Sequence, residues 1–440
     1  MTRKSDSDET PVHGAPIRTP DEASIRALGG APPTAAARPA RELPDLSEKL
    51  TAPSLPAMAG IAPDAGESDA PTDPVAEQLR APVTQAPRSL VAFAREAEPR
   101  LRELLERKKA AARDLPVDLW PAFAALRDYV LRGGKRLRGA LCLLGCEAGG
   151  GTRETALPAA LGLELLHAYL LIHDDFMDRD ELRRGGPTLH VSLGRTGALF
   201  AHDTRVPAGE HVGGSLAILF GSLCEAWALE LVLQSPAAPD RLVRAAQLLA
   251  RALAEVTLGQ ALDLAAPLGP PLGREGVLEI ERLKTGSYTV ELPLLLGARL
   301  AGASPETQVA LSDYARPLGQ AFQIVDDLLG VFGSPQVTGK SAGNDLREGK
   351  RTLLVLRAFE VAGEQDAQIL RAGLGRHDLS DRDVEALRRV LRRCGAEGWA
   401  REEADRLCLE ALAALESPAL PAPVAEELHA VARYTVQRVS

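Results

Sequence analysis

Residues 164–190 read ELLHAYLLIHDDFMDRDELRRGGPTLH, an apolar segment that ends in a group of carboxylates and is followed by two arginines. If the segment is helical, Asp174 and Asp178 lie one turn apart, about 6 Å along the axis, and share a face. Neighbouring carboxylates repel each other unless a cation neutralises them, and oxygen ligands suit a hard cation such as Mg²⁺. Arg183 and Arg184 carry forked donors that match phosphate oxygens. The stretch therefore predicts a site for a metal ion and a diphosphate, although DDxxD alone would also fit a solvated helix end.

The composition limits the classes of protein to consider. The chain has 440 residues and a formal net charge of −9 at pH 7, which argues against a general nucleic-acid-binding protein. The N-terminus lacks the apolar core of a signal peptide, and charges interrupt the apolar runs before they reach membrane-spanning length. We therefore expect a cytoplasmic protein with no transmembrane segment and no nucleic-acid partner.

The N-terminal part differs in composition from the rest. The first 90 residues hold fourteen of the 32 prolines, and no aromatic residue precedes Phe93. Such a segment buries too little apolar surface to offset the entropy of ordering it, so we expect residues 1–88 to be a disordered Pro/Ala-rich extension. Short apolar islands such as RELPDLSEKL (41–50) are typical of segments that fold onto a partner, and a plain spacer fits equally well.

Residues 89–440 have a helical pattern. Apolar residues recur at helical spacing between loops marked by Gly and Pro, and alternating runs of β-branched residues are few. This pattern predicts one large all-α domain. A second segment, AFQIVDDLLG (321–330), again places carboxylates, Asp326 and Asp327, after apolar residues. Two such segments could face each other across one cavity.

Six motifs in order resemble those of the trans-isoprenyl diphosphate synthases, the polyprenyl synthetase family. They are GGKRLRG (133–139), LLHAYLLIHDDFMD with LRRGGPTLH (165–190), GQALDL (259–264), KTGSYT (284–289), FQIVDD (322–327) and GKSAGNDLREGKRTLL (339–354). A class I terpene cyclase would share the DDxxD motif but not GGKRLRG or the arginine-rich segment. The resemblance covers roughly residues 100–440. It implies an all-α isoprenoid synthase-type fold around a deep central cavity, a homodimer, and head-to-tail condensation of an allylic diphosphate with isopentenyl diphosphate.

The resemblance also implies roles for individual residues. Three Mg²⁺ ions are expected, two held by Asp174 and Asp178 with support from Asp175, and the third held by Asp326. Contacts with the allylic diphosphate are expected from Arg183, Lys284 and Lys340. Contacts with isopentenyl diphosphate are expected from Gly134, Lys135, Arg138, His167 and Arg184. Thr285 and Gln323 are expected to steady the allylic cation, which apolar walls must protect from water.

Product length is expected to depend on the helix that leads into the first acidic motif. Leu170 and Tyr169 precede Asp174 by four and five residues, so they lie roughly 6–7.5 Å deeper along the axis. A bulky Tyr169 would act as a floor, and in the family an aromatic residue at this position alone usually accompanies a geranylgeranyl product. We therefore predict geranylgeranyl diphosphate, with farnesyl diphosphate or a longer chain as the alternatives.

Two further features bear on function. Gly330 stands where many members of the family have the last aspartate of a second DDxxD motif. Because such a departure can accompany loss of activity, a non-catalytic regulatory subunit of a prenyl synthase is the alternative to an active enzyme. Residues 1–88 resemble the cargo-loading segments of enzymes packaged in encapsulin-type protein shells. A shell partner, and a location inside a protein compartment, are therefore further expectations.

Overall fold

The structure is a computed structural model that describes residues 85–200, 209–269, 272–333 and 343–437. Three predictions lie outside these ranges. They are the disordered extension apart from its last four residues, the protein-shell partner that this extension would bind, and the diphosphate contact from Lys340.

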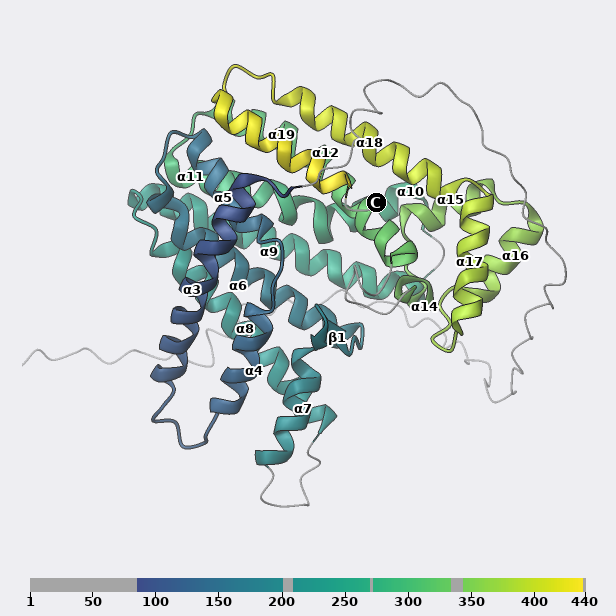
Figure 1. Ribbon diagram of the computed structural model, residues 1–440, viewed down its shortest axis with the longest axis horizontal. Coiled ribbons are helices and arrows are strands. Elements are labelled where there is room, and N and C mark those ends of the chain that lie inside the picture. Colours follow the sequence, from purple (N-terminus) through teal and green to yellow (C-terminus); the bar gives the residue numbers. More distant parts are fainter. Residues whose placement is uncertain (1–84, 201–208, 270–271, 334–342, 438–440) are drawn as a thin grey trace, which may run out of the picture. The chain divides into compact units, whose positions relative to one another are not determined.

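The first half of the described chain is helical except for one short hairpin (Figure 1). The elements in order are α3 (Arg88–Ala111), α4 (Trp120–Leu131), α5 (Leu137–Ala148), α6 (Arg153–Met177), β1 (Leu182–Arg183), β2 (Gly186–Pro187), α7 (Leu189–Phe200), α8 (Glu210–Leu233) and α9 (Pro239–Ala265).

The elements of the described second half are all helices, and one of them, η2, is a π-helix. The elements are η1 (Ala266–Leu268), α10 (Arg274–Glu281), η2 (Arg282–Glu291), α11 (Leu292–Ala301), α12 (Pro305–Phe332), α14 (Asn344–Glu348), α15 (Leu353–Val361), α16 (Glu364–Gly373), α17 (Asp381–Arg393), α18 (Ala396–Ala414) and α19 (Ala422–Val436). The predicted all-α fold class is confirmed.

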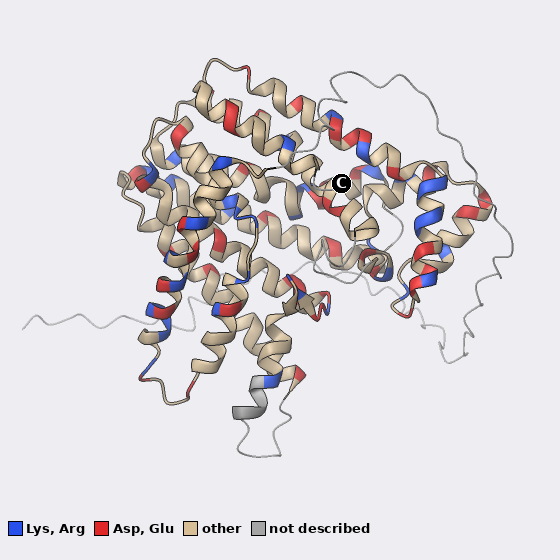
Figure 2. Cartoon of the chain, viewed as in Figure 1, with Lys and Arg blue, Asp and Glu red and all other residues tan. Residues whose placement is uncertain are grey.

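Local sequence signals explain where several helices begin. Ser304 caps α12 by accepting a hydrogen bond from the backbone N–H of Thr307 at 3.2 Å. Ser380 and Asp383 form a reciprocal capping box at the start of α17. Helices α3 and α17 carry charges of both signs (Figure 2), while the apolar residues of these helices face the core.

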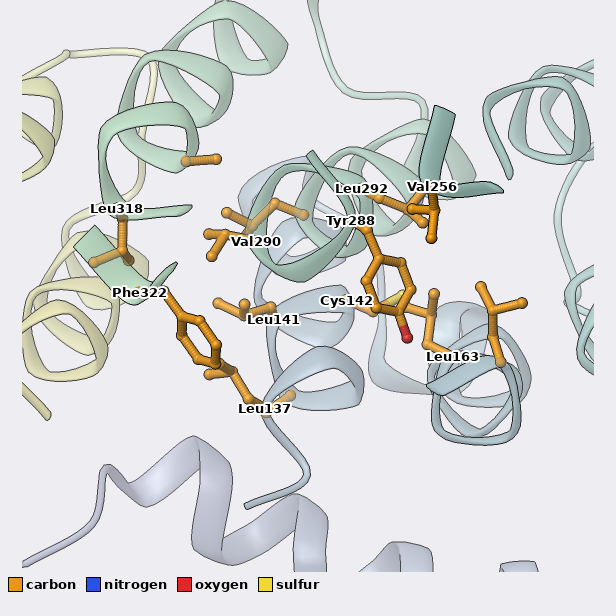
Figure 3. Packing of buried hydrophobic residues seen from close by; sticks show 14 of the residues in the cluster. Leu137, Leu141, Cys142, Leu163, Val256, Tyr288, Val290, Leu292, Leu318 and Phe322 are labelled. Atoms are coloured by element: carbon orange, nitrogen blue, oxygen red, sulfur yellow. The ribbon is translucent and has the colours of Figure 1, made fainter. Parts of the chain in front are cut away.

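The core lies between helices that are distant in sequence. Helix α6 packs against α5 and α8, α5 packs against α11, and α12 packs against α18 and η2. Figure 3 shows Leu141 of α5, Tyr288 and Val290 of η2 and Phe322 of α12 in this core. A Cβ atom at Gly297 of α11 would overlap the backbone of α5. The glycine therefore allows the two helices to approach closely.

The antiparallel pair β1–β2 was not expected from the sequence. Leu182 pairs with Pro187 and Arg183 with Gly186. The two residues between the strands, Arg184 and Gly185, both have positive φ, at 52° and 71°. Positive φ at both central positions is what a tight type I′ hairpin turn requires, so the strands can be only two residues long and still reverse the chain.

Two helices also depart from the expectation about membrane spans. By length and composition alone, α6 and α8 are apolar enough to cross a membrane. In α6, 67% of the most apolar window is buried inside the protein, and in α8 44% is buried. Helices of a protein core pass the same test, and packing against neighbouring helices accounts for the composition of α6.

Candidate active site

Asp175 lies at the inner side of the first acidic motif. Its side chain is fully buried and accepts hydrogen bonds from the Tyr129 hydroxyl at 2.6 Å and from Arg183 Nε at 2.7 Å. Arg183 also approaches Asp180 at 3.3 Å. Asp175 therefore holds the hairpin arginine against the end of α6, where the same guanidinium lies 3.6 Å from Asp174 Oδ2. The supporting role that the resemblance implies for Asp175 stays a prediction.

Asp174 is turned toward the helices α9 and η2. Its Oδ1 lies 3.3 Å from Gln260 Nε2 and 3.4 Å from Lys284 Nζ. Lys284 donates a second bond to Asp263 at 2.6 Å. Burial lowers the pKa of Lys284, but the charges of Asp174 and Asp263 outweigh this effect and the pKa is raised. A Cβ at Gly259 would lie 2.5 Å from Lys284 N, so this glycine allows η2 to approach α9.

Lys350 occupies the corresponding place beside Asp178. Its Nζ lies 3.2 Å from Asp178 Oδ2, 2.9 Å from Glu348 Oε2 and 3.7 Å from Asp345 Oδ1. Burial raises the pKa of Asp178, and the charge of Lys350 opposes that rise. Lys350 thus links the first acidic motif to α14.

The second acidic motif lies inside α12, which continues beyond it to Phe332, so its carboxylates do not lie at the end of a helix. Asp327 is only 5% exposed, and its Oδ1 accepts a bond from Gln323 Nε2 at 2.7 Å. Its Oδ2 has no hydrogen-bond donor among the described residues. Burial, together with the charges of Glu281 and Asp345, raises the pKa of Asp327 well above its usual value. Gln323 is therefore engaged by Asp327, and Asp326 lies beside it on the same helix.

The acidic residues of this site are of the type that binds Mg²⁺. Carboxylate oxygens are the ligands that this ion prefers, and the acidic residues of α6, α12 and α14 supply them. Within the described ranges, no three His, Cys, Asp or Glu side chains already form a metal-binding group. Lys284 and Lys350 neutralise the carboxylates instead, and the unbonded Oδ2 of Asp327 is suited to a cation. The donor set therefore fits the expected ion.

The residues expected at the second diphosphate surround the loop between α4 and α5. Arg184 donates to the backbone oxygen of Gly133 at 2.8 Å, and a Cβ at Gly134 would lie 2.9 Å from its guanidinium carbon. The glycine therefore leaves room for the arginine. Lys135 lies 5.3 Å from the ring centre of Tyr434 on α19. Gly134, Lys135 and Arg184 are thus brought to one loop.

Arg138 and His167 lie deeper, on α5 and α6. Arg138 lies 4.5 Å from the ring centre of Tyr288 and donates to Thr289 Oγ1 at 2.9 Å. Burial, with the charges of Arg138 and Arg184, lowers the pKa of His167 well below its usual value. His167 is therefore neutral, and its Nδ1 has no partner among the described residues. Thr285 is partly buried on η2, next to Lys284.

A buried ion pair beneath this loop was missed by the sequence analysis. Arg136 and Glu164 are 7% and 4% exposed, and Arg136 Nη1 donates to Glu164 Oε2 at 3.2 Å. Glu164 also accepts from the backbone N–H of Gly139 at 3.1 Å. A glutamate on the apolar face of a predicted helix was the signal that could have indicated a buried partner.

The two residues expected to set product length lie one turn before the first acidic motif. Tyr169 is partly buried, and its ring meets that of His173 edge-on at 4.6 Å. Burial and the charge of Glu225 raise the pKa of Tyr169, and a hydrogen bond with Thr257 opposes the rise. Glu225 belongs to α8 and Thr257 to α9, so the side chain points from α6 toward these two helices. Leu170 is also partly buried against the core.

Comparisons with known proteins agree with this arrangement. Residues 121–391 match the polyprenyl synthetase family. The chain is 36% identical to a geranylgeranyl diphosphate synthase of Methanosarcina mazei, over 62% of this chain and 76% of the relative. It is 35% identical to a geranylfarnesyl diphosphate synthase of Aeropyrum pernix, over 70% of this chain and 91% of the relative. Other relatives are named farnesyl diphosphate synthases. The crystal structure of a geranylgeranyl pyrophosphate synthase from Corynebacterium glutamicum, complexed with isoprenyl diphosphate and magnesium, superimposes with a TM-score of 0.74 at 35% identity, covering 79% of this chain and 98% of that one. The chain therefore belongs to the polyprenyl synthetase family, whose members are transferases of prenyl groups.

Proposed function

We propose that this prenyltransferase condenses isopentenyl diphosphate with allylic diphosphates and that its final product is geranylgeranyl diphosphate. The observation that carries the proposal is that lysines bind both outer carboxylates of the first acidic motif, Asp174 and Asp178. Lys284 lies between Asp174 and Asp263, and Lys350 lies between Asp178 and α14. Lysines can contact the oxygens of a diphosphate, and carboxylates can hold the metal ions bound to it. Incubation of the purified protein with both diphosphates and Mg²⁺, followed by product analysis, tests the proposal.

In this proposal Asp174, Asp178 and Asp326 would hold three Mg²⁺ ions. When bound, these ions neutralise the charge that develops on the departing pyrophosphate. Arg183 and Lys284 then contact the allylic diphosphate, and Asp175 fixes the direction of Arg183 through the 2.7 Å bond. Charge stabilisation by fixed groups lowers the barrier because the groups need no reorganisation as the bond breaks.

The loop after α4 would bind isopentenyl diphosphate without a metal. Arg184 and Arg138 supply fixed positive charge, and His167 is neutral and can offer a single N–H. A neutral imidazole beside a cationic intermediate adds no repulsive charge. Gln323 and Thr285 would face the allylic cation if Gln323 exchanges its present bond to Asp327.

Removal of the Tyr169 ring should lengthen the product. With Tyr169→Ala, the growing chain is expected to pass the present floor, so geranylfarnesyl diphosphate or a longer chain should accumulate in place of geranylgeranyl diphosphate. Chromatography of the dephosphorylated products measures the outcome. Phe359→Ala on α15 removes a surface ring, 37% exposed, and should leave the product unchanged. Products of Tyr169→Ala no longer than those of the wild type would place the floor elsewhere.

The proposal includes a homodimer formed through α8 and α9. These helices contact each other and expose large apolar side chains, among them Leu219 and Leu258, each 61% exposed. Apolar surface of this extent is typical of an interface between subunits. Leu219→Asp should therefore shift the protein from dimer to monomer in analytical ultracentrifugation. Val309→Asp, at a residue on α12 that is 58% exposed, should not, and an equal effect of both changes would contradict this interface.

The N-terminal extension is assigned a separate role in the proposal. Its composition alone suggests that residues 1–88 direct the enzyme to a protein shell in the cytoplasm, while the catalytic domain comprises residues 89–440. On this view the extension takes no part in the prenyl transfer.

A further inference from the structure

The second acidic motif of this chain ends in a glycine, and the structure places another carboxylate in the space above it. Gly330 follows Asp326 by four residues and Asp327 by three, so all three lie on one side of α12. A Cβ at Gly330 would overlap Oδ2 of Asp345, the second residue of α14. The backbone of Gly330 is thus in direct contact with the Asp345 carboxylate, where an aspartate side chain at residue 330 would begin.

The surroundings of this carboxylate are those of a cation site. Asp327, on the same face of α12, has an Oδ2 that is buried and has no donor among the described residues. Asp327 precedes Gly330 by three residues on α12, and Asp345 Oδ2 lies against the backbone of Gly330, so both carboxylates lie beside this glycine. On its other side, Asp345 Oδ1 lies 3.7 Å from Lys350 Nζ, which also contacts Asp178. Asp345 therefore lies between the two acidic motifs. It contacts α12 at Gly330, and it connects to Asp178 of the first motif through Lys350.

We propose that Asp345 supplies the carboxylate that the second acidic motif lacks at Gly330, so that α12 and α14 together bind magnesium. The inference rests on the proposed function, because it assigns a further oxygen donor to the metal site of that reaction. It also explains why position 330 is a glycine, since any side chain there would displace the carboxylate of Asp345. A third carboxylate is thus present in the site, but it comes from a different helix.

Metal binding without turnover tests the inference. Titration calorimetry with Mg²⁺ in the presence of inorganic pyrophosphate gives a dissociation constant for each variant. Asp345→Ala should weaken Mg²⁺ binding about 10–100-fold, the range seen when groups that support a metal site are removed. Gly330→Ala should weaken it as well, because its methyl group takes the place of the Asp345 carboxylate. Asp313→Ala, on an exposed part of α12, should bind as the wild type does.

The decisive variant exchanges the two positions. In the double variant Gly330→Asp with Asp345→Ala, the carboxylate comes from α12 itself. Its Mg²⁺ affinity should return to within about fivefold of the wild type, a smaller difference than the loss of about 10–100-fold expected for Asp345→Ala alone. Circular dichroism would show that each variant is folded. Wild-type affinity in Asp345→Ala, or no recovery in a folded double variant, would overturn the inference. The proposed function fails separately, if the wild type binds Mg²⁺ and pyrophosphate but forms no prenyl product.

Discussion

Asp174→Asn is expected to lower kcat by about 10²–10³-fold, the cost of removing one group that stabilises developing charge in a transition state. The change keeps the size of the side chain but removes the charge that now attracts Lys284 at 3.4 Å. In the proposed function the same charge holds Mg²⁺, so the variant should also need a higher Mg²⁺ concentration for half-maximal rate. Steady-state assays over a range of Mg²⁺ concentrations measure both effects.

Asp240→Asn is the matched control for this change. Asp240 lies at the start of α9, its side chain is 61% exposed, and it pairs only with Arg244 in the same helix among the ion pairs of the described residues. Its loss should leave kcat and the Mg²⁺ dependence unchanged. If Asp174→Asn retained more than a tenth of the wild-type rate, Asp174 would not be a metal ligand in the reaction.

Glu164→Ala is expected to lower the free energy of unfolding by about 3–5 kcal/mol, because it leaves the charge of Arg136 buried without its partner. The backbone N–H of Gly139 would also lose its acceptor. Urea unfolding followed by circular dichroism measures the change. The loss should affect the whole domain, because Glu164 joins α6 to the loop and helix that carry Arg136 and Gly139.

A double variant separates the ion pair from simple loss of packing. Arg136→Met with Glu164→Leu replaces both charges by apolar side chains and should recover most of the lost stability. Glu103→Ala removes an exposed pair with Arg107 and should cost about 0.5 kcal/mol or less. If Glu103→Ala and Glu164→Ala cost the same, the buried pair would have no special role in stability.

The helices and the first acidic motif could be predicted from sequence because their signals are local. Apolar residues at helical spacing gave α6, and the spacing of Asp174 and Asp178 placed them one turn apart, where the N–H of Asp178 bonds the carbonyl of Asp174 at 2.8 Å. The inward position of Asp175 could not be derived in this way. It depends on Tyr129, which reaches it from a helix that lies 46 residues earlier.

The hairpin and the π-helix escaped prediction for a different reason. Strands of two residues are too short to show alternation, and the turn depends on positive φ at Arg184, which favours glycine and gives no signal in an arginine. The segment Arg282–Glu291 has an apolar pattern that fits an ordinary helix as well. Nothing in the sequence of this segment therefore indicates a π-helix.

The acidic residues around α14 required the three-dimensional structure. Gly330 was recognised in the sequence as a missing aspartate, but nothing in the sequence indicates that Asp345 lies against it. Lys350 lies in the last of the six motifs, and its ion pair with Asp178 at 3.2 Å joins residues that are 172 positions apart. Contacts of this kind join segments that are far apart in the chain, and sequence periodicity does not report them.

The central claim is tested most directly by the products that the full-length protein makes from isopentenyl diphosphate, dimethylallyl diphosphate and Mg²⁺. Chromatography and mass spectrometry of the extracted prenyl chains should show geranylgeranyl diphosphate as the main product, and chelation of Mg²⁺ should stop its formation. No turnover with any allylic primer would contradict the assignment of a synthase, and a main product of another length would contradict the assignment of geranylgeranyl diphosphate.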